Sequence, residues 1–410
     1  MTRKRNKLQI SSQFLHCPLF LSIDTYEGCS NLCRYCFANP QYERQNRGTQ
    51  RRESVRPALL TKWERVLSGQ SIGNPMIEYL VSKKHPVQLG TKADPFPRGI
   101  EQKVQNTRKF IELCNRVNYP VYISTKNTGE MPIDLLAEGN YVLGVSLASH
   151  KAADIKMLET NTSSPQERLS QIPSGVFKKI IVRWQPFIPQ LFRSKNGNEP
   201  IDRTEIDHFL DMIADVADGV SISFLGWGGK GVQELLRIIG PENLDDLDAI
   251  EVLTYIKEQA HLRGMEFYTA NYKALSDSPV CCGLREDEFE ISTKWVWAYL
   301  IKKLFTGERE YITTDDLKAA FPDAVKNVMF ATMDVALFSR WARYSAKKTT
   351  ILEEYIKDFT YNRKMNPANF FAGLYSKVVD GEFRIYFMDY RTQVNPDLLP
   401  ISANQETVKI

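Results

Sequence analysis

Three cysteines near the start of the chain have a spacing that suits metal chemistry. Cys29, Cys33 and Cys36 form the pattern C-x3-C-x2-C, and Tyr35 places an aromatic ring beside the last thiol. Three thiolates on one short loop can each hold one iron of a cubane and leave the fourth iron without a protein ligand. A chelating ligand needs such an open iron. The spacing therefore predicts a [4Fe–4S] cluster with these three cysteines as its metal ligands.

Two other kinds of metal site could use the same cysteines. A structural zinc site takes four ligands, and a ferredoxin-type cluster takes a fourth cysteine. The nearest further ligands, His16 and Cys17, precede the first expected strand and would reach the loop only by an awkward path. The seven cysteines are odd in number, which makes a poor disulfide framework and favours a metal site in a reducing compartment.

Composition and charge restrict the class of protein. The 410 residues are 43% hydrophobic and 25% charged, as in a soluble protein with a sizeable core. A formal net charge of +4 does not by itself indicate a nucleic-acid partner. The sequence has no run of about 18 apolar residues, and its basic start lacks the features of a signal peptide. We expect no membrane association and a cytoplasmic location, which is the host cytoplasm if a phage encodes the protein.

The elements that must position the cysteines alternate between short apolar runs and longer amphipathic stretches. The expected strands are Leu19–Asp24, Pro86–Leu89, Val121–Thr125, Tyr141–Ser146, Lys179–Trp184, Gly219–Phe224 and Met265–Thr269. Helical patterns such as Gln102–Val117 and Glu205–Ala217 lie between them. Repeated strand–helix units predict an α/β fold with a parallel sheet and helices outside. Six units would form a partial (βα)6 barrel, similar to a TIM barrel, with its chemistry at the C-terminal ends of the strands.

This pattern divides the chain into three regions. Residues 1–18 form a basic tail that we expect to be unstructured, residues 19–275 the partial barrel, and residues 276–410 a mainly helical C-terminal region. The helices expected in the last region are Thr293–Leu304, Thr314–Ala320, Asn327–Arg343 and Ile351–Thr360. A strand pair, Ser376–Val379 and Phe383–Met388, flanks the turn at Asp380-Gly381.

The cysteine motif, in its position after the first strand, resembles the motif of the radical S-adenosylmethionine (SAM) superfamily. In that family the amine and carboxylate of SAM chelate the open iron. An electron from the reduced cluster then cleaves the sulfonium bond, and the resulting 5′-deoxyadenosyl radical takes a hydrogen atom from the substrate. The resemblance implies a [4Fe–4S] cluster and SAM as cofactors, and an external electron donor of the flavodoxin or ferredoxin type.

Residues 19–195 further resemble the spore photoproduct lyase-like branch, also called DNA-repair photolyase-like. The segments that carry this resemblance are Gly90–Pro95, Ser124–Asn127, Val145–Leu147, Leu158–Leu169 and Val182–Pro189. The chain departs from related sequences in three ways. Gly90-Thr91-Lys92 replaces the Gly-Gly-Glu-like segment that many radical SAM proteins use for the methionyl amine. Glu159 is followed by Thr160 rather than by proline, and no cysteine stands at a clear hydrogen-donor position.

Polar residues at the strand ends suit the cofactor that this resemblance implies. SAM needs acceptors for its amine and ribose hydroxyls and donors for its carboxylate. Asp94, Ser124, Lys126, Ser146 and Arg183 supply both kinds of group from four strand ends. Each of them alone could be a helix cap or a solvated loop residue. Together with Tyr35 they form the predicted cofactor-binding set.

Basic residues outside the strands are candidates for contacting the substrate. Arg44, Arg47, Arg51 and Arg52 follow the cysteine motif, where they could bind phosphates or form a solvated linker. Lys230 lies in the glycine-rich segment 225–231 and could meet an anion, although the same segment could be a turn that binds no ligand.

Three functions remain open at this stage. The favoured hypothesis is a radical SAM enzyme that abstracts hydrogen from a pyrimidine base in nucleic acid, for repair or hypermodification, for instance phage thymine hypermodification. The second is a radical SAM enzyme acting on a small metabolite, a peptide or a protein. The third is a non-catalytic iron–sulfur or zinc protein that binds nucleic acid.

Overall fold

The structure is a computed structural model, and it describes most of the first 284 residues and a few segments beyond them. The described residues are 8–10, 19, 21–36, 38, 55–82, 84–193, 201–225, 230–240, 246–269, 275–278, 282–284, 309–313, 316, 374–380 and 382–387.

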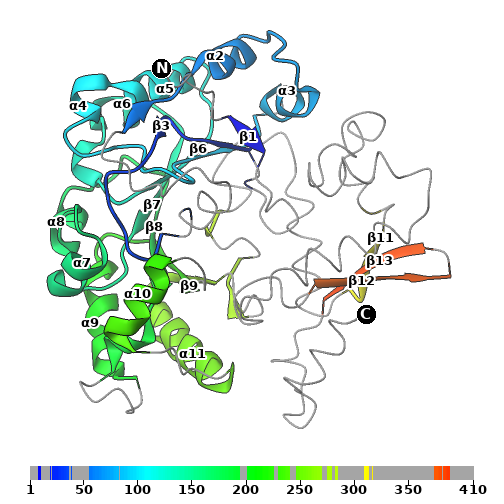
Figure 1. Cartoon of the computed structure of the whole chain (residues 1–410). Coiled ribbons are helices and arrows are strands. Elements are labelled where there is room, and N and C mark those ends of the chain that lie inside the picture. The colour runs from blue at the N-terminus through cyan, green and yellow to red at the C-terminus, as the bar shows by residue number, and fades with distance from the viewer. Residues whose placement is uncertain are drawn as a thin grey trace.

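An eight-stranded sheet lies at the centre of the fold (Figure 1). Its strands, in spatial order, are β1 (Gln9–Ile10), β2 (Leu21–Ile23), β5 (Val87–Leu89), β6 (Val121–Thr125), β7 (Tyr141–Ser146), β8 (Lys179–Phe187), β9 (Gly219–Phe224) and β10 (Glu266–Thr269). β1 is antiparallel to β2, and every other neighbouring pair is parallel. The predicted α/β class and parallel sheet are confirmed, and β6, β7 and β9 have the predicted bounds. β1 falls within the tail that was expected to be unstructured.

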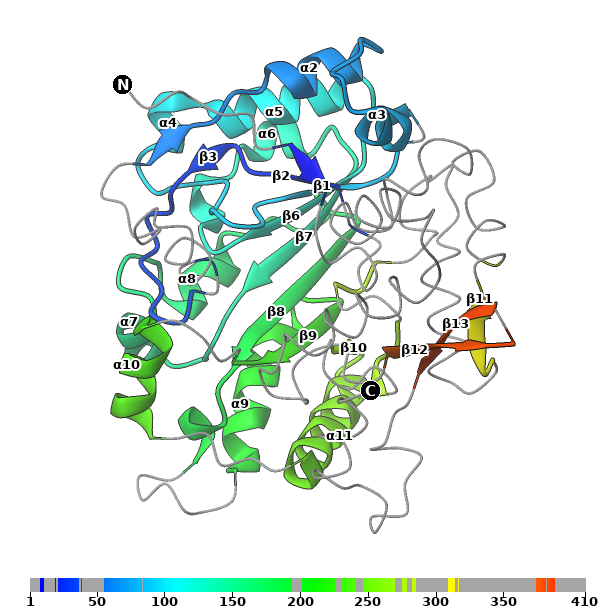
Figure 2. The ribbon, with the colours of Figure 1, turned by 45° about the vertical axis from the view of Figure 1, so that its right-hand side comes forward.

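Helices connect the parallel strands in chain order and lie above, to the left of and below the sheet in Figure 2. They are α2 (Thr61–Leu67), α3 (Pro75–Ser82), α4 (Glu101–Val104), α5 (Asn106–Asn115), α6 (Ile133–Leu136), α7 (Ala152–Leu158), α8 (Pro165–Ser170), α9 (Arg203–Ala214), α10 (Lys230–Ile239) and α11 (Asp246–Leu262), with short 3-10 turns at Thr128–Glu130 and Pro189–Phe192. None of the described helices is both long enough and apolar enough to cross a membrane.

The predicted helix Gln102–Val117 is in fact two helices, α4 and α5. The break falls at Gln105, whose φ of +55° is left-handed and ends α4. The Glu101 carboxylate then accepts hydrogen bonds from the backbone amides of Thr107 (3.2 Å) and Arg108 (2.8 Å) in the first turn of α5. These amides lack helical partners, so the carboxylate stabilises the start of a second helix.

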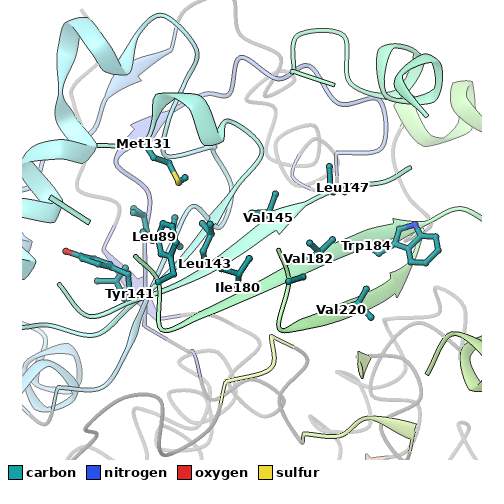
Figure 3. Packing of buried hydrophobic residues seen from close by; sticks show 14 of the residues in the cluster. Leu89, Met131, Tyr141, Leu143, Val145, Leu147, Ile180, Val182, Trp184 and Val220 are labelled. Atoms are coloured by element: carbon teal, nitrogen blue, oxygen red, sulfur yellow. The ribbon is translucent and has the colours of Figure 1, made fainter. Parts of the chain in front are cut away.

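The two faces of the sheet differ in polarity. Alternate strand residues pack with the helices into one apolar core, some of which Figure 3 shows, including Leu143, Val145 and Val182. Because side chains alternate between faces, the residues between them point to the other side. We call that side the polar face because most of its members are polar, although Val142 and Ile181 also point to it. Its other members include Ser22, Gln88, Tyr122, Ser124, Gly144, Ser146, Lys179, Arg183, Gln185, Ser221, Ser223, Glu266 and Tyr268. A parallel sheet is usually apolar on both faces, so the polar face is where a ligand can bind.

The packing of the first region continues beyond the predicted boundary at residue 275. Asp277 donates its backbone amide to the Phe267 carbonyl at 2.8 Å. The Lys179 ammonium on the polar face donates to the Gly283 carbonyl at 2.9 Å. Gly283 lies so close to the Tyr268 ring that a Cβ at this position would clash with it. The region therefore extends at least to residue 284.

The described residues of the C-terminal region form a three-stranded antiparallel sheet. Its strands are β11 (Tyr311–Thr313), β13 (Glu382–Phe387) and β12 (Leu374–Val379), in that spatial order. The predicted hairpin around Asp380 is confirmed, whereas β11 was not expected. Apart from Asp316, the helices predicted for this region lie outside the described residues.

Candidate cluster and cofactor site

The three cysteines lie on a tight turn directly after β3 (Tyr26–Glu27), which pairs with β4 (Arg56–Pro57). We call residues 28–36 the cluster loop. Gly28 turns the backbone with a φ of +84°, a value that glycine adopts without steric cost. The Cys36 amide donates to the Cys33 carbonyl at 3.3 Å and closes the turn. Cys33 is buried, whereas Cys29 and Cys36 are partly exposed, and all three thiols are free of disulfides.

The thiols of the cluster loop lie in an environment that disfavours their charged form. Burial raises the pKa of the Cys29 thiol to about 12, and the nearby Asp94 carboxylate adds to the rise. Burial, the charge of Glu159 and the other two cysteines raise the pKa of Cys33 well above its ordinary value. A positively charged metal centre would offset these costs, because the thiolate is the form that binds metal.

The number and type of donors distinguish between a structural zinc ion and a cluster. A structural zinc site takes four protein ligands, whereas three thiolates on one loop can hold a cubane and leave its fourth iron open. The donor set of the cluster loop therefore fits a [4Fe–4S] cluster better than a structural zinc ion. A different trio of described residues, His150, Glu205 and His208, has its ligand atoms within 4.8 Å of one another. The Glu205 carboxylate of this trio already has a positively charged partner, because the Lys151 ammonium lies 2.5 Å from it.

The cluster loop is held against the segment that follows α7. Cys33 forms an antiparallel bridge with Glu159, and the Arg34 amide donates to the Leu158 carbonyl at 2.9 Å. The Asn161 side-chain amide donates to the Ser30 carbonyl, also at 2.9 Å. Segments about 130 residues apart in sequence thus fix the middle of the loop.

Glu159 is the centre of a buried charged network beside the cysteines. Its carboxylate accepts hydrogen bonds from the Tyr35 hydroxyl and from Arg168 and pairs with the Lys126 ammonium at 3.0 Å. Lys126 also donates to the Tyr35 hydroxyl at 2.9 Å. Burial alone would raise the pKa of the Glu159 carboxyl, but the positive charges of Lys126 and Arg168 lower it to about 2. Glu159 is therefore ionised and links the cluster loop to β6 and α8.

Arg168 is fully buried, with no part of its side chain exposed. Its remaining donors reach the Ser146 carbonyl at 2.8 Å and the Ser163 carbonyl at 3.1 Å. A buried guanidinium is tolerated only when its charge is paired and its donors are bonded. Arg168 thereby joins the end of β7, which carries Ser146, to the Glu159 network.

Asp94 is the centre of a second network, which contacts the loop at Asn31. Its carboxylate accepts from the Asn31 side chain (2.9 Å), the Thr125 hydroxyl (2.8 Å) and the backbone amides of Lys126 (2.8 Å) and Phe96 (3.0 Å). Burial raises the pKa of Asp94, and these amide donors oppose the rise. The described contacts make Asp94 a brace between the cluster loop and the ends of β5 and β6.

The predicted residues Ser124 and Arg183 meet on the polar face. The Arg183 guanidinium donates to the Ser124 hydroxyl and, through Nε (3.2 Å) and Nη2 (2.7 Å), to Oε1 of Gln185. The Gln185 amide in turn donates to the Ser221 hydroxyl at 2.7 Å. This chain of contacts crosses β6, β8 and β9.

The structure brings most of the predicted site residues together in two groups. Tyr35, Asp94 and Lys126 contact the cluster loop or one another, while Ser124, Ser146 and Arg183 lie on the polar face. Lys230 begins α10. The predicted substrate residues Arg44, Arg47, Arg51 and Arg52 lie outside the described residues, as do the glycines before Lys230.

Four further residues of this site were not predicted from the sequence: Glu159, Arg168, Asn31 and Gln185. Glu159 and Arg168 belong to a segment that carried the family resemblance, and nothing in their spacing showed that both charges are buried. Asn31 lies inside the cysteine motif, where its hydrogen bonds to Asp94 and Asn127 hold the loop. Only the folded chain shows these partners.

Comparisons with known proteins give partial matches. No protein-family model matches the chain. It is 30% identical over 217 residues to the uncharacterized proteins Rv2578c of Mycobacterium tuberculosis (strain ATCC 25618 / H37Rv) and Mb2609c of Mycobacterium bovis. The match covers 50% of this chain and 58% of each relative, so the chain spans less than two thirds of their length.

Two solved structures are similar at low sequence identity. A spore photoproduct lyase mutant with dinucleoside spore photoproduct has a TM-score of 0.43 at 14% identity, over 65% of this chain and 80% of that one. Streptococcus suis SuiB bound to S-adenosylmethionine has a TM-score of 0.41 at 14% identity, over 62% of this chain and 51% of that one.

Proposed function

We propose that this protein is a radical SAM enzyme that abstracts a hydrogen atom from a pyrimidine base in nucleic acid, in repair or hypermodification. The observation that carries the proposal is the cluster loop. It presents the three thiols of the C-x3-C-x2-C motif, and it is braced by Asp94 through Asn31 and by Glu159 through Cys33. We further propose that the six strands β2 and β5–β9 form the partial barrel expected from the sequence.

Cys29, Cys33 and Cys36 would hold a [4Fe–4S] cluster, and SAM would lie between the cluster loop and the polar face. When bound together, these groups supply a 5′-deoxyadenosyl radical that takes hydrogen from a substrate. Hydrogen bonds from the backbone of Asn31 and Asp94 oppose the rise in the pKa of the Cys29 thiol. Hydrogen bonds of this kind to the ligating sulfurs help to set the reduction potential of an iron–sulfur cluster. An external donor of the flavodoxin or ferredoxin type would supply the electron.

Lys126 is suited to bind the carboxylate of SAM. An ammonium has three donors, and the described contacts of Lys126 use two, toward Tyr35 and Glu159. The third donor remains for a ligand, and 13% of the side chain is exposed. Glu159 holds the ammonium in place through their ion pair.

Tyr35, Asp94, Ser124 and Ser146 complete the proposed cofactor site. Tyr35 places its ring beside the cysteines while its hydroxyl donates to Glu159. Asp94 fixes the backbone of Lys126, so its part is to position that residue and the loop. Ser124 and Ser146 offer hydroxyls on the polar face that suit the ribose of SAM. The buried setting limits access of water to the radical.

Nucleic acid is proposed as the substrate because of two features of the sequence. The motif segments resemble the spore photoproduct lyase-like branch, and an arginine-rich stretch follows the cluster loop. Arginines bind phosphates with an affinity that falls as salt rises.

Anaerobic reconstitution tests the proposed chemistry. We expect about four irons per chain and, after reduction with dithionite in the presence of SAM, formation of 5′-deoxyadenosine. A variant with all three cysteines of the cluster loop changed to serine should give neither, while Cys114→Ser, at a buried cysteine in α5, should give both. Reconstituted protein that forms no 5′-deoxyadenosine would refute the radical SAM proposal.

The proposed substrate is tested separately. The reduced protein is incubated with SAM and DNA deuterated at thymine, and 5′-deoxyadenosine is analysed for deuterium. Binding of the same DNA is measured at 50 and 200 mM salt. We expect deuterium transfer and weaker binding at the higher salt. Binding that does not depend on salt, or the absence of deuterium transfer, would exclude DNA as the substrate.

A further inference from the structure

We infer that Arg183, with Ser124 and Gln185 as its supports, binds a phosphate group of the substrate on the polar face of the sheet. This inference rests on the proposed function, because it assigns part of the nucleic-acid or nucleotide substrate to a place in that site. It also separates Arg183 from the cofactor-binding set to which sequence analysis assigned it.

The Arg183 guanidinium is held in one orientation with two donors left over. A guanidinium has five N–H donors. Arg183 uses Nε and one N–H of Nη2 toward Gln185, and one N–H of Nη1 toward Ser124. One N–H on each terminal nitrogen therefore remains. These two charged N–H groups can donate to phosphate oxygens.

The charge of Arg183 has no acidic partner among the described residues. Its contacts there are a hydroxyl and an amide oxygen, both neutral. Lys126 and Lys179 differ in this respect, because Lys126 pairs with Glu159 and Lys179 pairs with Glu266 at 2.6 Å. A partly buried, unpaired cation is costly, so a bound anion would recover interaction energy at Arg183.

The backbone around Arg183 is shaped to leave room for its side chain. A Cβ at Gly144, on the neighbouring strand β7, would lie 3.0 Å from Cδ of Arg183 and would clash with the Tyr122 hydroxyl. Ser146 and Ser221 are the cross-strand neighbours of Arg183 on β7 and β9. The guanidinium is thus flanked by hydroxyl-bearing residues, which also favours an oxyanion.

The position of Arg183 points to the substrate rather than to the cofactor. The described contacts of the cluster loop go to segments that follow β5, β6 and β7, through Asp94, Asn127 and Glu159. Those of Arg183 go to β6 and within β8, and Gln185 extends them to β9. A donor for the SAM carboxylate is already present at Lys126. Lys126 contacts the cluster loop directly through Tyr35, whereas the described contacts of Arg183 include no residue of that loop, and this difference assigns Arg183 to the substrate.

Paired binding measurements test this inference. The probes are thymidine 5′-monophosphate and thymidine, which differ by one phosphate, and SAM is titrated separately into the same reconstituted protein. We expect the wild type to bind the monophosphate at least about tenfold more tightly than thymidine, as charged hydrogen bonds of this kind imply. Arg183→Gln should remove this preference and leave SAM affinity within about twofold. Arg183→Lys should keep part of the preference, because the charge remains without the fork.

A second variant supplies the opposite control. Lys126→Gln should weaken SAM binding and leave the ratio of the two nucleotide affinities unchanged. Iron content and thermal unfolding of each variant verify that it is folded and loaded. If Arg183→Gln weakens SAM binding and keeps the phosphate preference, or if the wild type shows no preference, the inference is wrong. A phosphate preference that depends on Arg183 in protein that forms no 5′-deoxyadenosine would uphold this site while refuting the proposed chemistry.

Discussion

Glu159 shows how a single buried charge can organise a site. The residue is almost fully buried, where an unpaired carboxylate would be prohibitively costly. Lys126 and Arg168 supply two positive charges, and Tyr35 supplies a hydroxyl donor. Removing one member of such a network leaves the others buried without compensation. That penalty exceeds the net contribution of the intact network.

We predict that Glu159→Gln destabilises the protein by about 3 to 5 kcal/mol. The isosteric amide keeps the shape of the side chain but leaves the buried Arg168 charge without a counter-charge. Anaerobic urea unfolding of the apoprotein measures the loss, and iron content after reconstitution should fall as well. The matched control is Glu167→Gln on the exposed side of α8, which should change stability by less than about 0.5 kcal/mol. Equal stability of the two variants would contradict the role assigned to Glu159.

The loop after β5 illustrates positioning at the level of an element. Asp24, just after β2, accepts hydrogen bonds from the amides of Thr91 (2.8 Å), Lys92 (3.0 Å) and Ala93 (3.4 Å), which brings Asp94 to the cluster loop. Gly90 begins this loop with a φ of +85°. A Cβ at Gly90 would clash with the Ser124 carbonyl and lie 2.7 Å from Cδ of Pro95. The turn therefore needs glycine for both its backbone angle and its lack of a side chain.

We predict that Gly90→Ala costs more stability than Gly99→Ala and lowers iron incorporation, whereas Gly99→Ala does not. Both glycines have positive φ, so both substitutions carry the backbone penalty of about 1 to 2 kcal/mol. Only at Gly90 would the added Cβ also clash with neighbouring atoms, because nothing lies within 4 Å of a Cβ at Gly99. Thermal unfolding and iron assays compare the two variants. Similar results for both would mean that the loop after β5 can shift without affecting the cluster loop.

At the scale of the whole molecule, residues beyond the predicted domain boundary complete the first region. The Asp277 carboxylate pairs with Lys257 (3.0 Å) and His261 (2.6 Å) of α11 and accepts the Phe267 amide at 2.7 Å. Burial alone would raise the pKa of Asp277, but His261, the Phe267 amide and Lys257 together lower it. The segment after β10 is thereby tied to α11, whose Leu253 and Ile256 lie in the core.

We predict that Asp277→Asn destabilises the protein by about 1 to 2 kcal/mol at pH 7. Because the folded-state pKa lies below the ordinary value of 3.8, the carboxylate stabilises the fold fully above pH 3.8 and loses this effect as the pH falls through the folded pKa. The difference from wild type should therefore shrink as the pH falls below about 4. Urea unfolding at several pH values measures it.

Asp211→Asn is the control for Asp277→Asn. Asp211 pairs with Arg263 at 2.7 Å, but 62% of its side chain is exposed. Exposed ion pairs contribute little, so this variant should stay within about 0.5 kcal/mol of wild type at every pH. A difference between Asp277→Asn and wild type that grew as the pH fell below about 4 would contradict the assignment.

The sequence by itself determined which segments form the parallel strands and how the three cysteines of the cluster loop are spaced. Strands such as Val121–Thr125 and Tyr141–Ser146 were predicted with their actual bounds, because short β-branched and aromatic runs between turn residues are a local signal. The C-x3-C-x2-C spacing is equally local. Asp94 and Lys126 were placed correctly at strand ends because parallel strands bring those ends to one edge of the sheet.

Only the tertiary structure decided how these residues are held. The pairing of Glu159 with Arg168, the brace from Asp94 to Asn31 and the contact of Arg183 with Ser124 join segments from different strand–helix units. Such contacts depend on sheet order and on which side chains share a face, and no local pattern of residues encodes either. The cysteine spacing predicts that a cluster can bind, and the folded chain decides which charged groups surround it.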